Sequence, residues 1–124
     1  MRKRVSRPKI WLIEEYKGLQ SLIVSRLVEE GFRVKAIRTL EEAVAQLAKE
    51  TATPAALVLD TLNQPLSLDA LDSLPDDIPL LVCTGPLDAG GPLLVQRPHT
   101  TLLQKPFTIA ELVDGVGKMC YKEN

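Results

Sequence analysis

The feature of this chain that most restricts its fold is an uninterrupted apolar run, Ala55 to Leu59, which stops at Asp60. Pro54 precedes the run, and a short apolar segment between a helix breaker and a carboxylate is typical of a strand buried on both faces. Strands of this kind occur in parallel sheets that helices cover on both sides. We therefore expect a central parallel strand whose carboxyl end carries Asp60.

Three further apolar segments are predicted strands, and each stops at polar side chains. They are Lys9 to Ile13, followed by Glu14 and Glu15; Ile78 to Cys83, followed by Thr84; and Leu102 to Gln104, followed by Lys105. In a fifth segment Phe32, Val34 and Ala36 alternate with cationic residues, which indicates a strand with one solvated face near a sheet edge. The chain thus contains five candidate strands.

Three segments between and after these strands have the pattern of amphipathic helices. The first predicted helix begins near Leu19 and ends before Gly31, a residue that commonly closes a helix. Its expected apolar positions are Leu22, Ile23, Leu27 and Val28. The second begins at Thr39 and the last at Thr108, because Glu42 and Glu111 stand three residues after these threonines as in a capping box.

Two other helical positions are less regular. Ser67 is a candidate cap for a short helix that continues to Leu74. The segment from Pro86 to His99 occupies the fourth-helix position, but it contains two adjacent glycines and three prolines. Because this composition opposes a regular helix, we expect an irregular or short fourth helix.

The alternation of strands with helices predicts an α/β fold, a doubly wound parallel sheet joined by right-handed crossovers. Ligands bind such sheets at the carboxyl ends of the strands. The polar residues that follow or end the predicted strands are Glu14, Glu15, Asp60, Thr84 and Lys105. We expect their side chains to converge on one site.

This set of side chains suits the transfer of a phosphoryl group to a carboxylate. Clustered carboxylates repel one another, and oxygen ligands favour a hard divalent cation such as Mg²⁺. With this charge screened, Asp60 could attack phosphorus while Lys105 stabilises the phosphoryl oxygens. Thr84 would donate a hydrogen bond to the product. In the alternative interpretation, the acids are solvated charges at strand ends.

Length and charge narrow the class of protein. The 124 residues suit one domain, and no apolar run approaches the roughly 20 residues that span a bilayer. Five of the 15 cations precede Ile10, which leaves 10 cations against 16 acids. We therefore expect a basic tail at residues 1–8 and a domain at residues 9–124.

The tail lacks the apolar segment of a signal peptide, which favours the cytoplasm. Cys83 and Cys120 lack zinc-site spacing and are expected to be reduced thiols.

Four segments, IWLIEEY, ALVLDTLNQP, LLVCTG and LLQKPFT, resemble the signatures of the response-regulator receiver family. The resemblance covers the chain after the basic tail. It implies a flavodoxin-like (βα)5 fold with strand order 2-1-3-4-5. By the same resemblance, Glu14, Glu15 and Asp60 hold Mg²⁺ and Asp60 is the phosphoryl acceptor. Thr84 then senses the phosphoryl group, and Lys105 contacts it.

The resemblance also implies partners, and the chain departs from the family pattern in three places. The implied partners are a histidine kinase or phosphotransfer protein and a downstream output protein or domain. A homodimer is left open, and neither nucleic acid nor membrane is expected. The family usually has aspartates where this chain has glutamates, and Pro65 stands one position late without the glycine that usually follows. Leu102 replaces an aromatic residue whose rotation reports phosphorylation.

The sequence is therefore compatible with three functions. The first is a phosphorylation-dependent switch, and the second is a degenerate receiver that binds a partner without phosphorylation. The third is an enzyme with an aspartyl nucleophile, such as a dehalogenase-like phosphatase, but those enzymes have a second aspartate where this chain has Leu62. Asp60, Thr84 and Lys105 favour the switch, whereas the glutamate pair and Leu102 favour degeneracy. We expect a regulatory domain and not an enzyme.

Overall fold

The computed structural model describes residues 7–60, 68–84 and 97–121. Five strands form one parallel sheet. They are β1 (Lys9–Ile13), β2 (Arg33–Ile37), β3 (Ala56–Asp60), β4 (Leu80–Thr84) and β5 (Thr100–Gln104). The described helices are α1 (Lys17–Glu29), α2 (Leu40–Leu47), α3 (Leu68–Asp72) and α5 (Ile109–Cys120). The strand order is β2-β1-β3-β4-β5, which confirms the order expected from the sequence.

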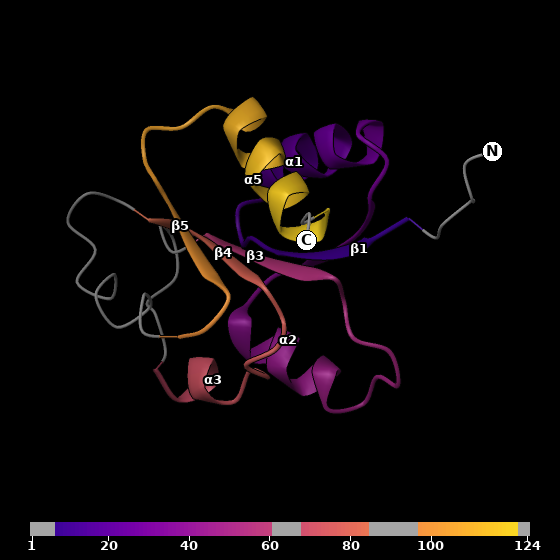
Figure 1. Cartoon of the computed structure of the whole chain (residues 1–124), viewed down its shortest axis with the longest axis vertical. Coiled ribbons are helices and arrows are strands. Elements are labelled where there is room, and N and C mark those ends of the chain that lie inside the picture. The colour runs from indigo at the N-terminus through magenta and orange to yellow at the C-terminus, as the bar shows by residue number, and fades with distance from the viewer. Residues whose placement is uncertain (1–6, 61–67, 85–96, 122–124) are drawn as a thin grey trace.

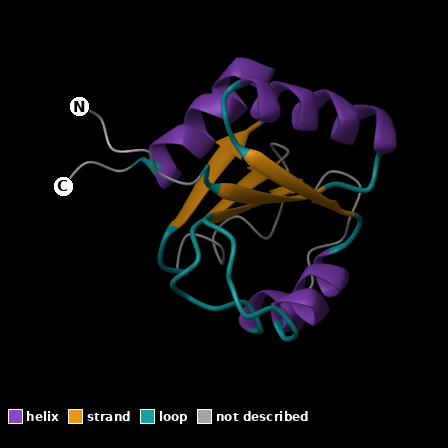
Figure 2. Cartoon of the chain, turned by 90° about the vertical axis from the view of Figure 1, so that its right-hand side faces the viewer, coloured by secondary structure: helices purple, strands orange, loops and turns teal. Residues whose placement is uncertain are grey.

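Helices cover the sheet on both faces, as the alternation of elements predicts. Figure 1 shows α1 and α5 on one side of the strands and α2 and α3 on the other. Figure 2 shows the same three layers after a quarter turn, with the strands between the two groups of helices. Among the described residues, no helix is long and apolar enough to cross a membrane.

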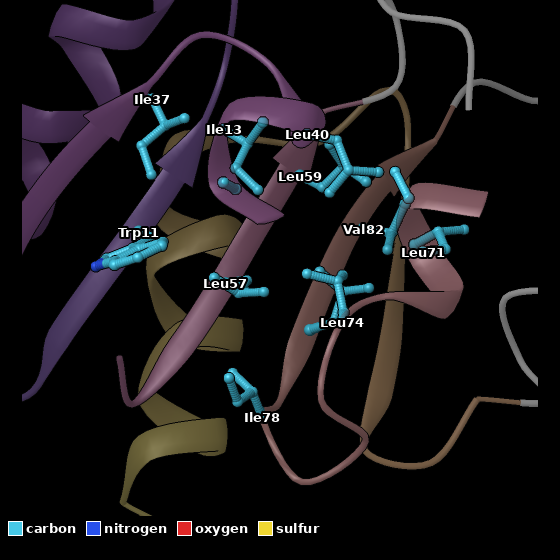
Figure 3. Close-up of a cluster of buried hydrophobic side chains, with 13 residues drawn as sticks. Trp11, Ile13, Ile37, Leu40, Leu57, Leu59, Leu71, Leu74, Ile78 and Val82 are labelled. Carbon is cyan, nitrogen blue, oxygen red and sulfur yellow. The ribbon is translucent and has the colours of Figure 1, made fainter. Parts of the chain in front are cut away.

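The strands carry two hydrophobic clusters, one on each face, because successive side chains of a strand point to opposite faces. Trp11 and Ile13 of β1 and Leu57 and Leu59 of β3 belong to the cluster under α2 and α3, part of which Figure 3 shows. Ile10, Leu12 and Val58 belong with residues of α1 and α5 to the other cluster. All five residues of β3 are buried, which confirms the predicted central strand.

The predicted helix starts at Thr39 and Thr108 are confirmed. The Thr39 hydroxyl accepts a hydrogen bond from the Glu42 backbone N–H at 3.1 Å. Thr108 and Glu111 form a complete capping box, in which each side chain accepts from the backbone N–H of the other at 3.0 Å. Such caps satisfy N–H groups that the first helical turn leaves without partners. These contacts fix where α2 and α5 leave the sheet edge that carries the candidate site.

The first helix differs from its prediction at its start and on its buried face. It begins at Lys17, two residues before Leu19, and ends as expected before Gly31, whose φ is 99°. Leu22 and Val28 were expected to face the core, but they are 52% and 49% exposed. Ile23 and Leu27 are buried there, so the buried stripe is narrower than the apolar pattern suggested.

The less regular helices are described in part. The third helix has five residues, Leu68–Asp72, and its expected cap Ser67 lies outside the described residues. The prediction of an irregular fourth helix falls mainly on residues 85–96, which also lie outside them. Strand β5 starts at Thr100, two residues earlier than predicted, because Thr100 is already paired with Leu80 of β4.

Candidate functional site

The predicted site residues lie at the carboxyl edge of the sheet. Asp60 is the last residue of β3 and is 3% exposed, and Thr84 is the last residue of β4 and is 6% exposed. Lys105 directly follows β5, and its backbone N–H donates to the Thr84 carbonyl oxygen at 2.8 Å. Parallel pairing therefore places all three residues at one edge, as the sequence predicts.

Lys105 and Asp60 form an ion pair across the end of β4. The Lys105 Nζ lies 3.1 Å from both Oδ1 and Oδ2 of Asp60. The lysine side chain is 19% exposed, so this pair is largely shielded from water. A shielded pair is screened less by solvent and salt than a surface pair. Lys105 is thus the cation that balances the buried carboxylate of Asp60.

Glu14 is the second buried carboxyl group of the site, with 1% exposure. Its Oε2 accepts a hydrogen bond from the Tyr16 backbone N–H at 2.9 Å, while its Oε1 is buried with no hydrogen-bond partner among the described residues. Burial, followed by a hydrogen bond with Asp60, raises the pKa of Glu14 to about 7. Two acids in contact cannot easily both be ionised in a poorly solvated site. The negative charge of Asp60 therefore disfavours the ionised form of Glu14.

Glu15 is directed away from this cluster. Its Oε1 lies 3.8 Å from Nη2 of Arg38, and the two side chains are 41% and 63% exposed. Within residues 7–60, 68–84 and 97–121, no group of three or more His, Cys, Asp or Glu side chains is placed to hold a metal ion. The predicted convergence of five side chains therefore brings Glu14, Asp60, Thr84 and Lys105 to one edge, with the carboxylate of Glu15 turned outward.

The buried carboxyl oxygens nevertheless suit Mg²⁺. The Oε1 atom of Glu14 is a buried acceptor without a donor, and the neighbouring carboxylate of Asp60 offers further oxygens. Mg²⁺ is commonly bound through one or two carboxylates, with water completing its shell. Glu14 and Asp60 thus fit the expected cation.

Comparison with solved structures gives the fold, while comparison with sequences gives no match. No family model matches the chain, and no curated protein matches it. The response regulator receiver protein from Sinorhizobium medicae WSM419 is 24% identical, with a TM-score of 0.73 over 94% of this chain and 96% of that chain. The Francisella response regulator 1452 receiver domain is 18% identical, with a TM-score of 0.72 over 94% and 98%. FixJ-N is 20% identical, with a TM-score of 0.72 over 97% and 98%. This chain has the receiver fold.

Two residues around the site of this receiver fold were missed by the sequence interpretation. Arg38 follows β2, and Gln20 of α1 donates from Nε2 to the Glu14 backbone oxygen at 2.9 Å. The signal for Arg38 was available, because it is the first charged residue after the predicted strand that contains Phe32, Val34 and Ala36. Gln20 could not be found in this way, since its role depends on how α1 is seated on the sheet.

Proposed function

We propose that this chain is a receiver domain of a two-component signalling system, in which Asp60 accepts a phosphoryl group. The observation that carries the proposal is the placement of Asp60, nearly buried at the end of β3, with Lys105 Nζ at 3.1 Å from both of its carboxylate oxygens. A phosphoryl acceptor needs an anionic oxygen and a fixed cation beside it, and both are present here.

The proposed step moves a phosphoryl group from a phosphohistidine to Asp60. One carboxylate oxygen forms a bond to phosphorus, the phosphorus–nitrogen bond breaks, and its electron pair returns to the imidazole of the donor. Lys105 then shifts from the carboxylate to the oxygens of the transferred group, whose charge it stabilises. The hydroxyl of Thr84, at the end of the adjacent strand, donates a hydrogen bond to the same group.

Mg²⁺ belongs to this proposal as a cofactor, held by Glu14 and Asp60 and completed by Glu15. When bound, the cation supplies positive charge that screens the carboxylates and the phosphoryl oxygens. Glu14 contributes a buried oxygen at a fixed position, because its other oxygen is tied to the Tyr16 N–H. Its longer side chain, compared with an aspartate, reaches Asp60 from the neighbouring strand β1.

The proposed partners are a histidine kinase or phosphotransfer protein and a downstream output protein or domain. A site that accepts one phosphoryl group and passes on a conformational signal is regulatory, so we propose a signalling domain of the cytoplasm and not a metabolic enzyme. A second copy of the chain is a further candidate partner. The acidic body of the domain makes nucleic acid an unfavourable direct partner.

A degenerate receiver is the second candidate, and specific observations favour it. Glu15 is paired with Arg38, so one of the predicted metal ligands is engaged elsewhere. Leu102 is partly buried and packs against the cluster under α2 and α3, and it has no aromatic ring whose rotation could report phosphorylation. In this alternative the domain binds its partner through its surface without being phosphorylated.

Phosphorylation of the purified chain by acetyl phosphate distinguishes the two candidates. We expect a single phosphoryl adduct by intact mass in the presence of Mg²⁺, and little adduct with a chelator. The matched control is Asp60→Asn, which preserves the size of the side chain and removes the anionic oxygens. An adduct that persists in Asp60→Asn, or none in the wild type at saturating Mg²⁺, would favour the degenerate receiver.

A further inference from the structure

The ion pair between Glu15 and Arg38 holds one predicted metal ligand outside the site. We propose that Arg38 is a latch that competes with Mg²⁺ for Glu15 and lowers the affinity of the domain for the cation. This inference rests on the proposed function, because it concerns the same metal site. Arg38 acts through Glu15, so it is a positioning residue that does not itself contact the cation or the phosphoryl group.

The backbone makes this pairing a consequence of sheet register. Ile13 of β1 lies opposite Ile37 of β2, and the Glu14 N–H donates to the Ile37 carbonyl oxygen at 2.9 Å. Glu15 and Arg38 therefore leave the ends of two hydrogen-bonded strands at the same edge. Arg38 is further confined because the next residue, Thr39, is the cap of α2. The two side chains meet without any rearrangement of the backbone.

The weakness of the pair is what allows it to work as a latch. Its atoms are 3.8 Å apart and both side chains are substantially exposed, so water and salt screen the attraction. Exposed pairs contribute at most about 1 kcal/mol, which corresponds to about fivefold in an equilibrium constant. A bound cation can thus displace Arg38, but part of its binding free energy is consumed in doing so.

The two glutamates consequently have different roles. Glu14 is 1% exposed and is held by the Tyr16 N–H, so it offers its oxygen whether or not the latch is closed. Glu15 is free to exchange between Arg38 and the cation, because 41% of its side chain faces solvent. We infer a two-ligand site when the latch is closed and a three-ligand site when it is open.

A binding measurement on four proteins tests the latch. Mg²⁺ affinity is measured by calorimetry, and Mn²⁺ affinity by loss of the free-ion signal in electron paramagnetic resonance. The proteins are the wild type, Arg38→Gln, Glu15→Gln and the double variant. We expect Arg38→Gln to tighten binding about threefold in the presence of Glu15, and to change it by less than about 1.5-fold in the Glu15→Gln background, since exposed pairs are worth this much.

The matched control is Arg26→Gln. Arg26, which is 43% exposed, pairs at 4.0 Å with Glu29, which is 63% exposed, so this is also a weak pair between two solvent-exposed side chains. The control removes one positive charge and one weak ion pair from α1, at the last turn of the helix. We expect no tightening of Mg²⁺ binding from it. Thermal unfolding of each variant shows whether the fold is retained.

The outcomes separate the latch from the proposed function. If Arg38→Gln tightens binding equally with and without Glu15, Arg38 acts by its charge and the latch is overturned. The latch is also overturned if wild type and Arg38→Gln bind Mg²⁺ equally, although the metal site then stands. Failure of all four proteins to bind either cation would overturn both the latch and the Mg²⁺ part of the proposed function.

Discussion

The Lys105 ammonium bridges both carboxylate oxygens of Asp60 at 3.1 Å and so joins the ends of two strands that do not pair with each other. Strand β4 lies between them, and its last residue, Thr84, accepts the Lys105 backbone N–H. The lysine is thereby fixed by its backbone and by its side chain. The positive charge of Lys105 is therefore part of the candidate site and also stabilises the fold.

Lys105→Met should destabilise the protein by about 2 kcal/mol in urea unfolding, because it leaves the buried Asp60 carboxylate without its cation. Lys118→Met is the matched control: Lys118 pairs with Asp114 at the same 3.1 Å, but its side chain is 78% exposed. We expect less than about 0.5 kcal/mol from the control. Equal losses in the two variants would show that burial does not strengthen the Asp60 pair.

Glu14 should make the stability of the protein depend on pH near neutrality. Its pKa is raised from 4.5 to about 7 by burial and by the hydrogen bond with Asp60, so the folded state binds a proton more tightly than the unfolded state. Stability from this group is complete below pH 4.5 and is lost as the pH rises toward 7. The total change is on the order of 3 kcal/mol.

Urea unfolding at several pH values between 5 and 8, with a chelator present, measures this loss. Glu14→Gln should give a flatter profile than the wild type, since glutamine does not ionise. Glu111→Gln is a suitable control, because Glu111 is exposed in the capping box at the start of α5. A wild-type profile as flat as that of Glu14→Gln would mean that the Glu14 carboxyl titrates normally.

The fold could be predicted from the sequence because the local signals for each helix and strand agree with the overall arrangement of the sheet and its helices. The apolar run before Asp60 and the threonine caps at Thr39 and Thr108 each specify an element without knowledge of its neighbours. Helix α1 was predicted less well. Its apolar residues cover more of its circumference than the sheet can bury, so periodicity marked Leu22 and Val28 as core although they face solvent.

The sequence predicted where the site residues lie on the sheet, but it did not predict which contacts their side chains make. That Asp60, Thr84 and Lys105 share one edge follows from parallel strands, and the structure confirms it. The different directions of Glu14 and Glu15 could not be predicted in the same way. They depend on local contacts, because the Tyr16 N–H donates a hydrogen bond to Glu14 whereas Arg38 forms an ion pair with Glu15.

Arg97 should stabilise the opposite end of β5 without affecting the site. Its Nη2 donates to the carbonyl oxygens of Pro75 at 2.6 Å and Ile78 at 3.1 Å, and its Nη1 donates to the Thr100 hydroxyl at 3.0 Å. Burial lowers the pKa of this guanidinium. Arg97→Lys retains a charge but loses the planar fork of donors, so we expect about 2 kcal/mol less stability.

The measurement is urea unfolding combined with acetyl phosphate labelling at a temperature where the variant is folded. Labelling of Asp60 should stay within about twofold of the wild type, because Arg97 precedes β5 whereas Lys105 follows it. Arg33→Lys serves as the control, since the Arg33 side chain donates an exposed hydrogen bond from Nε to the Arg7 carbonyl oxygen. A large loss of labelling in folded Arg97→Lys would instead connect the two ends of β5.

Thr84 provides the last test, because its hydroxyl and its backbone have separable roles. The carbonyl oxygen of Thr84 holds the Lys105 N–H at 2.8 Å and is retained in any substitution. Thr84→Ala removes a hydroxyl that is proposed to donate to the phosphoryl group, and a hydrogen bond to a charged group contributes about 1.5 kcal/mol or more. We therefore expect acetyl phosphate to label Thr84→Ala about tenfold more slowly than the wild type, and Thr84→Ser at close to the wild-type rate, measured by intact mass over time.

The two variants both lose the methyl group of a side chain that is 6% exposed, so packing changes are shared between them. If alanine and serine slowed labelling equally, the lost methyl group would be the cause, and the hydroxyl would have no part in the transfer.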